Sequence, residues 1–205
     1  MSAGHYENFP VASVLLPAPL RYPVSVIYCF ARSADNFADE GDLPAAERLA
    51  QLDDYRQELR RLESGAAPQL PLFAELGQIV SRYRLPLPLF HALLDAFSQD
   101  VVKGRYADFA ELMDYCRRSA DPVGRLLLHL FGAATEGNLK HSDAICSSLQ
   151  LINFLQDVGI DWRKNRIYLP QDELQRYGVS ERQIEAGDTA GRWKALMQFQ
   201  VERAR

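Results

Sequence analysis

The sequence predicts an all-α protein, and three observations support this fold class. The 205 residues show no strand-like alternation of apolar and polar side chains. They contain neither an internal repeat nor a low-complexity segment. Proline and glycine instead separate segments whose apolar residues follow helical spacing. We therefore expect one helical domain over residues 1–205, with eight or nine helices and ample length for a core.

An irregular arm is expected before the first long helix. Residues 1–21 contain three prolines, and their apolar side chains suggest that the arm packs against the body of the protein. Ser13 in this arm is a candidate substrate contact, although a lone serine more often has a structural role. Pro23 suits the first turn of a helix that runs to about Glu40, where a glycine can end it.

The later helices are bounded by the same kinds of residue. Lys103 and Arg105 lie between two of them and could meet phosphate, but a solvated role is more common for such residues. Proline, glycine and a capping aspartate mark the boundaries. We expect helices at residues 44–63, 72–83, 88–102 and 109–118, a very apolar helix after Asp121-Pro122, short helical turns over 171–186 and a final amphipathic helix over 189–205.

A narrow polar stripe is predicted within residues 150–170. Four polar side chains are spaced i, i+3, i+7 and i+11: Gln150, Asn153, Asp157 and Asp161. At about 100° per residue they cover a sector roughly 80° wide on a helix, and apolar residues cover the other faces. We expect a buried helix whose carboxylates need metal ions or cationic groups as partners. An acidic helix end beside Arg163 and Lys164 is the structural alternative.

A second stripe of the same kind lies upstream. Its side chains are spaced i, i+4, i+7 and i+11: Tyr28, Arg32, Asp35 and Asp39. Each stripe ends in a DxxxD pair, whose carboxylates lie side by side and repel each other. A sequence gains nothing structurally by placing such a pair on two buried helices. A diphosphate bridged to the protein by Mg²⁺ ions would offset the repulsion, so the two stripes together predict a Mg²⁺–diphosphate site.

Two other side chains are candidates for this site. Tyr115 could donate or accept a proton there, although tyrosines in a core are more common. Arg166 lies in the basic turn WRKNRIYLP, which could fold over a bound phosphate or form an ordinary surface loop.

Composition limits the partners of the protein. A net charge of −4 gives no electrostatic support for nucleic-acid binding. The three cysteines lack CxxC spacing and indicate free thiols in a reducing compartment. No secretory signal opens the sequence, and no apolar run approaches the length of a membrane-spanning helix. We expect a cytoplasmic protein, with peripheral contact at the inner membrane left open.

Four segments, in this order and spacing, resemble the squalene/phytoene synthase family of head-to-head prenyl transferases: YCFARSADNFADE, YCRRSADPVG, LQLINFLQDVGID and RIYLP. The resemblance implies an isoprenoid synthase-type helical bundle around a deep central cavity, with the two aspartate-rich motifs facing each other across its mouth. It implies Mg²⁺ as cofactor and a prenyl diphosphate as substrate. It also implies that relatives continue through further helices, which complete the cavity wall.

The resemblance and the two stripes select the same residues. Asn36 stands where the family often has a second adjacent aspartate, which removes one negative charge but keeps the DxxxD spacing. The predicted catalytic residues are Tyr115, Tyr28 and Arg32. The predicted substrate contacts are Arg32, Gln150, Asn153, Arg166 and Ser13. The predicted metal ligands are Asp35, Asp39, Asn153, Asp157 and Asp161.

Two short segments suggest a branch of the family. NFPVASVLLP and the run Asp121–Arg125 look most like the hydroxysqualene synthases of bacterial hopanoid synthesis, which convert presqualene diphosphate to hydroxysqualene. That reaction needs no hydride, and no nicotinamide fingerprint is present. The alternatives are the condensing branches, which make presqualene diphosphate, squalene or phytoene. From another class, the alternative is a catalytically silent member that acts as an assembly or lipid-binding partner.

Overall fold

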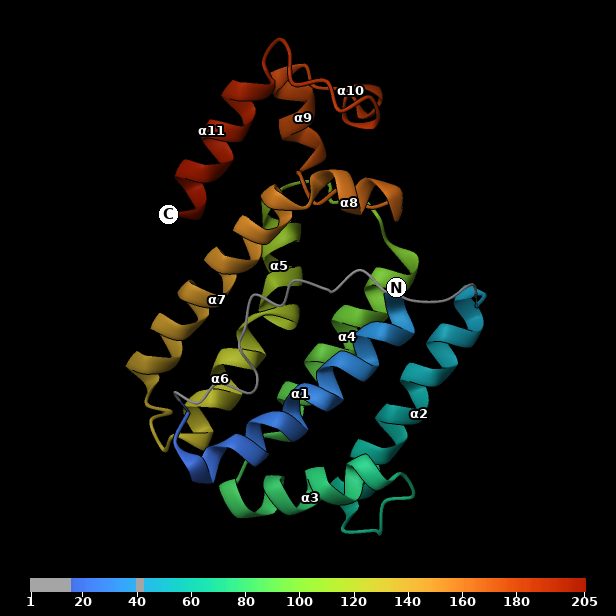
Figure 1. Cartoon of the computed structure of the whole chain (residues 1–205), viewed down its shortest axis with the longest axis vertical. Coiled ribbons are helices and arrows are strands. Elements are labelled where there is room, and N and C mark those ends of the chain that lie inside the picture. The colour runs from blue at the N-terminus through green and yellow to red at the C-terminus, as the bar shows by residue number, and fades with distance from the viewer. Residues whose placement is uncertain (1–15, 40–42) are drawn as a thin grey trace.

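The computed structural model describes residues 16–39 and 43–205, which form eleven helices and no strand (Figure 1). This confirms the all-α prediction, although short helices near the C-terminus raise the number above eight or nine. The helices are α1 (Ala18–Asp39), α2 (Ala45–Ser64), α3 (Pro71–Tyr83), α4 (Leu87–Val102), α5 (Phe109–Ser119), α6 (Asp121–Leu130), α7 (Glu136–Gln156), α8 (Val158–Arg163), α9 (Gln171–Tyr177), α10 (Glu181–Glu185) and α11 (Trp193–Ala204).

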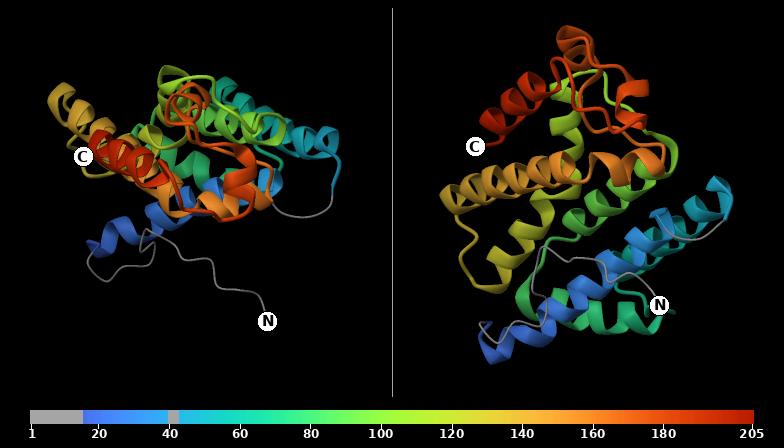
Figure 2. Two further views of the ribbon diagram at one scale, coloured as in Figure 1. Left: turned by 90° about the horizontal axis from the view of Figure 1, so that it is seen from above. Right: turned by 45° about the horizontal axis from the view of Figure 1, so that its top comes forward.

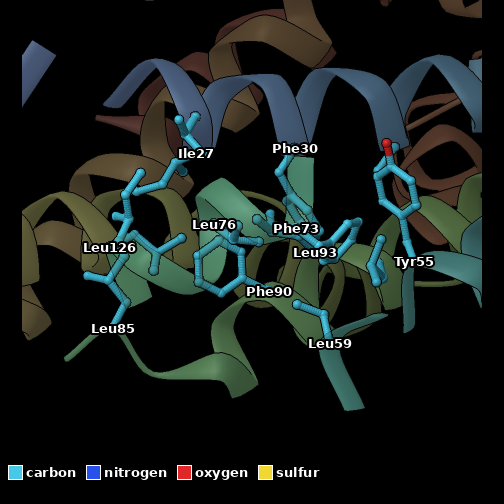
Figure 3. Packing of buried hydrophobic residues seen from close by; sticks show 14 of the residues in the cluster. Ile27, Phe30, Tyr55, Leu59, Phe73, Leu76, Leu85, Phe90, Leu93 and Leu126 are labelled. Carbon is cyan, nitrogen blue, oxygen red and sulfur yellow. The ribbon is translucent and has the colours of Figure 1, made fainter. Parts of the chain in front are cut away.

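The largest core joins α1 to α2, α3, α4 and α6. Phe30 of α1 is fully buried at its centre (Figure 3). The ring centroids of Tyr55, Phe73 and Phe90 lie 5.7, 5.8 and 5.2 Å from that of Phe30. Both phenylalanine rings meet Phe30 edge-on, which is a favourable arrangement for aromatic pairs. This core fixes the rotation of α1 about its axis and therefore the direction of its polar stripe.

Two smaller clusters complete the hydrophobic interior. One is rich in aromatic residues and joins α4, α5 and α7 with the segment that follows α8; in it Phe154 and Tyr168 stack with their centroids 3.9 Å apart. The other, which includes Ile167 and Leu196, lies among α8 to α11. Figures 1 and 2 show these last helices gathered at one end of the molecule and α1 and α3 at the other. The polar stripes meet between the two ends.

The first helix begins earlier than predicted. It starts at Ala18, so Pro23 lies inside the helix and not in its first turn. Proline has no N–H to donate to the carbonyl four residues earlier, which here belongs to Pro19. The Tyr83 hydroxyl of α3 donates to that oxygen at 3.4 Å and replaces the missing bond. The predicted end of the helix at Glu40 lies outside the described residues, as does Ser13.

The helix of the second stripe also differs from its prediction. It ends at Gln156, bends at Asp157, and continues as α8. The Asp157 carbonyl accepts bonds from the N–H groups of Ile160 and Asp161, both at 2.8 Å, so helical hydrogen bonding resumes directly after the bend. The expectation of a buried helix was wrong. Leu149 and Ile160 are 56% and 48% exposed, because neighbouring helices pack against only part of the circumference of α7 and α8.

Three further sequence predictions, about the cysteines, membrane spans and a helix cap, agree with the structure. All three cysteines are free. Within residues 16–39 and 43–205, every helix is too short or too polar to cross a membrane. The predicted cap at Asp108 is present, since its carboxylate accepts the N–H of Glu111 at 2.8 Å.

Candidate active site

A polar cavity of about 320 Å³ lies where α1, α4, α5, α7 and α8 meet. Both predicted aspartate pairs line it, together with Arg32, Gln150, Asn153, Tyr115 and Arg166. The full lining is Arg32, Asp35, Asp39, Asp100, Tyr115, Gln150, Asn153, Phe154, Asp157, Asp161, Arg166 and Tyr168. Residues separated by more than a hundred positions in sequence therefore share one site.

The two carboxylates of α1 differ in their electrostatic surroundings. Burial, reinforced by the charge of Asp39, raises the pKa of Asp35 to about 6, although Arg32 donates to Asp35 at 3.2 Å. Burial acts on Asp39 in the same direction. There the nearby cations Arg166 and Lys164 outweigh it and hold the pKa of Asp39 below its ordinary value. Asp39 is therefore the firmly ionised member of the pair.

The basic turn after α8 folds over the cavity. Arg166 is only 8% exposed, and its Nη1 lies 2.6 Å from Oδ1 of Asp39. The Lys164 Nζ lies 2.6 Å from Oδ2 of the same carboxylate. The Arg166 Nη2 also donates to the backbone oxygen of Asp100 at 3.0 Å. The surface-loop alternative is therefore wrong for Arg166, and Lys164 pairs with α1 instead of closing an acidic helix end.

The second aspartate pair contributes a further titratable group. Burial, with the neighbouring charge of Asp157, raises the pKa of Asp161 to about 7. Arg166 and Lys164 act against that shift without reversing it. Five aspartates but only two arginines line the cavity, so its carboxylates outnumber its cations. Such a site favours the binding of additional positive charge.

Two functional candidates, Asp100 and Tyr168, were not predicted from sequence. Asp100, at the end of α4, accepts hydrogen bonds from the hydroxyls of Tyr115 at 2.6 Å and Tyr168 at 3.2 Å. Burial raises the pKa of Asp100 to about 7, even though Arg166 and the two tyrosines favour its ionised form. A single acidic residue near the end of an apolar helix was the only signal available. It forms no repeated pattern, so the pattern analysis passed over it.

An apolar groove continues from the polar cavity. It lies between α6 and α7 and encloses about 690 Å³. Gln150 and Asn153 line both spaces, so the groove and the cavity meet at these two side chains. Its other lining residues are mostly aliphatic or small, with one aromatic residue, Phe131: Ser119, Ala120, Val123, Gly124, Leu127, Leu128, Phe131, Asn138, His141, Ser142, Ile145, Cys146 and Leu149.

Some predicted contacts are not brought to the cavity. Tyr28 is half-buried on α1 but does not line the polar cavity, and its catalytic role stays a prediction. Lys103 pairs with Glu111 instead of facing the site. Arg105 pairs with Glu181, with its Nε 2.7 Å from the carboxylate.

The donor chemistry of the cavity fits Mg²⁺. Carboxylate and amide oxygens come from both stripes, and negative charge is in excess. Among the residues that the structure describes, no three acidic, histidine or cysteine side chains are grouped so that they could hold a metal ion by themselves. Mg²⁺ at phosphate sites takes one or two carboxylates and completes its shell with phosphate oxygens and water. The arrangement therefore suits a metal ion that binds together with a diphosphate.

Comparison with known proteins gives the same picture for nearly the whole chain. The family model described as squalene/phytoene synthase matches residues 2–205. The hydroxysqualene synthase of Zymomonas mobilis is 41% identical over 199 residues, which is 95% of this chain and 63% of that protein. The phytoene synthase of Mycobacterium tuberculosis is 34% identical over 201 residues, or 97% of this chain and 65% of that protein. The chain thus spans about 65% of the length of such relatives.

Solved structures have the same fold. The squalene synthase HpnC from Alicyclobacillus acidocaldarius matches with a TM-score of 0.86 and 36% identity, over 98% of this chain and 74% of that one. A dehydrosqualene synthase matches with a TM-score of 0.79 over 90% of this chain and 63% of that one; at 24% identity this similarity concerns the fold alone. With its paired aspartate motifs on one cavity and a matching family model over residues 2–205, the chain belongs to the squalene/phytoene synthase family.

Proposed function

We propose that the protein converts presqualene diphosphate to hydroxysqualene, with release of diphosphate and with Mg²⁺ as cofactor. The observation that carries this proposal is the junction of two unlike spaces. A polar, aspartate-lined cavity opens at Gln150 and Asn153 into an apolar groove of about 690 Å³. A prenyl diphosphate has the same two parts, an anionic head and a long hydrocarbon tail. The 41% identity to a hydroxysqualene synthase supports this branch of the family.

The polar cavity would bind the diphosphate. Asp35, Asp39, Asp157 and Asp161, with Asn153, would hold Mg²⁺, and the bound metal would neutralise the charge that builds up on the departing diphosphate. Arg32 and Arg166 already face these carboxylates and would contact phosphate oxygens directly. Gln150 would orient the substrate at the entrance to the groove.

When the C–O bond breaks, its electron pair leaves with the diphosphate and a carbocation remains. The groove would protect this carbocation from stray water. Phe154, Tyr115 and Tyr168 line the polar cavity beside it, and aromatic rings there would stabilise positive charge. Water then adds to the cation and loses one proton, which gives the alcohol. The pKa of Tyr115 is raised well above its usual range by burial and nearby Tyr168 and Asp100, so its hydroxyl stays protonated. It can pass the proton towards Asp100, whose carboxylate lies 2.6 Å away.

A second candidate function is the head-to-head condensation of two prenyl diphosphates. Its support is the 34% identity to a phytoene synthase over 97% of this chain. A catalytically silent scaffold has less support. All four aspartates of the two motifs face one cavity, and loss of these carboxylates is the change that would favour a silent role.

The test supplies Mg²⁺ with presqualene diphosphate and, separately, with farnesyl diphosphate, in the absence of NADPH. Products are identified by gas chromatography–mass spectrometry. Hydroxysqualene from presqualene diphosphate supports the proposal. Formation of presqualene diphosphate from farnesyl diphosphate would instead assign the protein to the condensing branch. If neither substrate turns over, geranylgeranyl diphosphate is tested next. Failure with all three, together with no Mg²⁺-dependent binding of pyrophosphate, leaves the silent scaffold.

A further inference from the structure

Arg105 lies outside the lining of the polar cavity and is held by an unusually complete set of partners. Its Nε donates to Oε1 of Glu181 at 2.7 Å, and one Nη2 hydrogen donates to Oε2 at 2.9 Å. The other donors reach Asn165, through its backbone oxygen at 2.7 Å and its Oδ1 at 3.2 Å, and the backbone oxygen of Gly104 at 2.9 Å. A guanidinium has five N–H donors, and all five are used here. Arg105 therefore has no donor left for a phosphate.

The backbone around Arg105 is equally constrained. A Cβ added at Gly104 would lie 2.3 Å from the backbone oxygen of Asn165, so no larger residue fits without moving the chain. Asn165 itself has a φ of 57°, in the left-handed region where asparagine is one of the few tolerated residues. The N–H of Ile167 donates to the Gly104 oxygen at 2.8 Å. The segment 104–107 is thus the support on which the chain reverses at Asn165.

This reversal sets the direction of two cations. Lys164 and Arg166 flank Asn165, and both reach Asp39, more than a hundred residues away in sequence. A change in the backbone at Asn165 would move both side chains together. Arg105 contacts Asn165 twice and is the only arginine or lysine within the described residues that is shown bonded to it.

We propose that Arg105, anchored by Glu181, is a positioning residue for Lys164 and Arg166 and thereby for diphosphate binding. The proposal rests on the proposed function, because it takes Arg166 to be a diphosphate contact. Arg105 does not line the polar cavity, so the proposal gives it no direct contact with the diphosphate. It holds the turn at Asn165 so that the two cations converge on the Asp39 side of the cavity.

The test measures the affinity for inorganic pyrophosphate with Mg²⁺ by isothermal titration calorimetry on the full chain. Arg105→Gln should weaken binding roughly tenfold, as is typical when the support of a binding residue is removed. Arg105→Lys keeps the charge but cannot make five bonds, so its affinity for pyrophosphate should lie between those of the parent and Arg105→Gln. The matched control is Arg125→Gln, which removes another two-bond arginine–carboxylate pair, with Asp143 at 2.8 and 2.6 Å, and should bind as the parent does.

A double-mutant cycle separates positioning from a general loss of structure. In a background that carries both Lys164→Gln and Arg166→Gln, Arg105→Gln should cost less than a further twofold, because its effect passes through the two missing side chains. An equally large effect in both backgrounds would overturn the proposal. If Arg105→Gln does not fold, Glu181→Gln keeps the bonds to Asn165 and should give a smaller loss with the same dependence on Arg166. Parent-like binding by Arg166→Gln would refute the diphosphate contact that the proposed function assigns to Arg166, whereas a loss there with no effect at Arg105 refutes only the positioning role.

Discussion

Asp35 and Asp39 stand one turn apart on α1, yet the structure gives them different tasks. Asp39 is bonded to both Lys164 and Arg166, at 2.6 Å each, whereas Asp35 has the weaker contact with Arg32 at 3.2 Å. The carboxylate of Asp39 is therefore part of the framework as well as of the site. Asp35 lines the cavity with a pKa of about 6, raised mainly by burial, and we expect it to act mostly in ligand binding.

Asparagine substitutions should separate these two tasks. Asp39→Asn removes the charge that balances the largely buried Arg166, so we expect it to lower the free energy of unfolding by about 1–3 kcal/mol. Asp35→Asn should leave stability unchanged or slightly higher, because burial penalises the charge of Asp35 and the contact with Arg32 offsets only part of that penalty. Both should lower kcat/KM by about 10²-fold. Urea denaturation and steady-state assays at pH 7.5 measure the two effects, and equal stability of the two variants would show that the ion pairs of Asp39 contribute nothing.

Asp100 should make stability depend on pH. Its folded-state pKa of about 7 is raised by burial above the ordinary value, so its favourable contribution is complete below about pH 4 and is lost as pH rises through 7. Asp100→Asn keeps an acceptor for one tyrosine hydroxyl but carries no charge. Between pH 5 and pH 8 the parent should lose stability that Asp100→Asn does not lose. Over this interval the free energy of unfolding of the variant should therefore rise, relative to that of the parent, by on the order of 1 kcal/mol. Urea denaturation at both pH values tests this, and identical pH dependence in the two proteins would contradict it.

At the scale of elements, α6 and α7 cross at unusually short range. A Cβ added at Gly124 would lie 2.2 Å from Oγ of Ser142 and 2.5 Å from Sγ of Cys146. Both helices also line the apolar groove. The absence of a side chain at Gly124 therefore sets the spacing of the groove walls.

Gly124→Ala should consequently destabilise the protein, by about 1–3 kcal/mol in urea denaturation, because the added methyl group overpacks the crossing. Gly137→Ala is the matched control, since it lies on α7 with no atom within 4 Å of the added Cβ. That change should be neutral or stabilising by about 0.5–1 kcal/mol, as expected for alanine in a helix. Removing Ser142 Oγ and Cys146 Sγ by alanine substitution should restore part of the stability of Gly124→Ala. A Gly124→Ala protein as stable as its Gly137→Ala counterpart would show that the crossing relaxes freely.

The sequence predicted those elements whose pattern repeats, and missed those that depend on one distant contact. Both DxxxD pairs were found because helical spacing brings their side chains onto one face, and both pairs line the cavity, although Tyr28 of the first stripe does not. The start of α1 was misplaced, since Pro23 is accommodated there with help from Tyr83, some sixty residues away. The bend at Asp157 and the pairing of Lys164 with Asp39 likewise follow from tertiary packing, which no local pattern encodes.

At the scale of the whole molecule, the cavity connects two hydrophobic bodies. The large core holds α1 to α4 with α6, and the smallest cluster holds the segment after α8 together with α9 to α11 (Figure 1). Asp39 belongs to the first body, and Lys164 and Arg166 to the turn of the second. A ligand that binds to both aspartate pairs would therefore join the two bodies, and its binding should appear as increased stability of the entire chain.

We accordingly predict that Mg²⁺ and pyrophosphate together raise the thermal midpoint. A ligand at 100 times its Kd adds about 2.7 kcal/mol to the native state, which corresponds to roughly 5–10 °C for a chain of this size. Either component alone should give a much smaller shift, because carboxylates and phosphate repel each other without the metal and no three carboxylates hold it unaided within the described residues. Differential scanning fluorimetry, with EDTA to reverse the effect, is the measurement. Asp161→Asn should lose most of the shift, and the exposed Asp53→Asn on α2 should keep it. An undiminished shift in Asp161→Asn, or one that survives EDTA, would place the diphosphate outside this cavity.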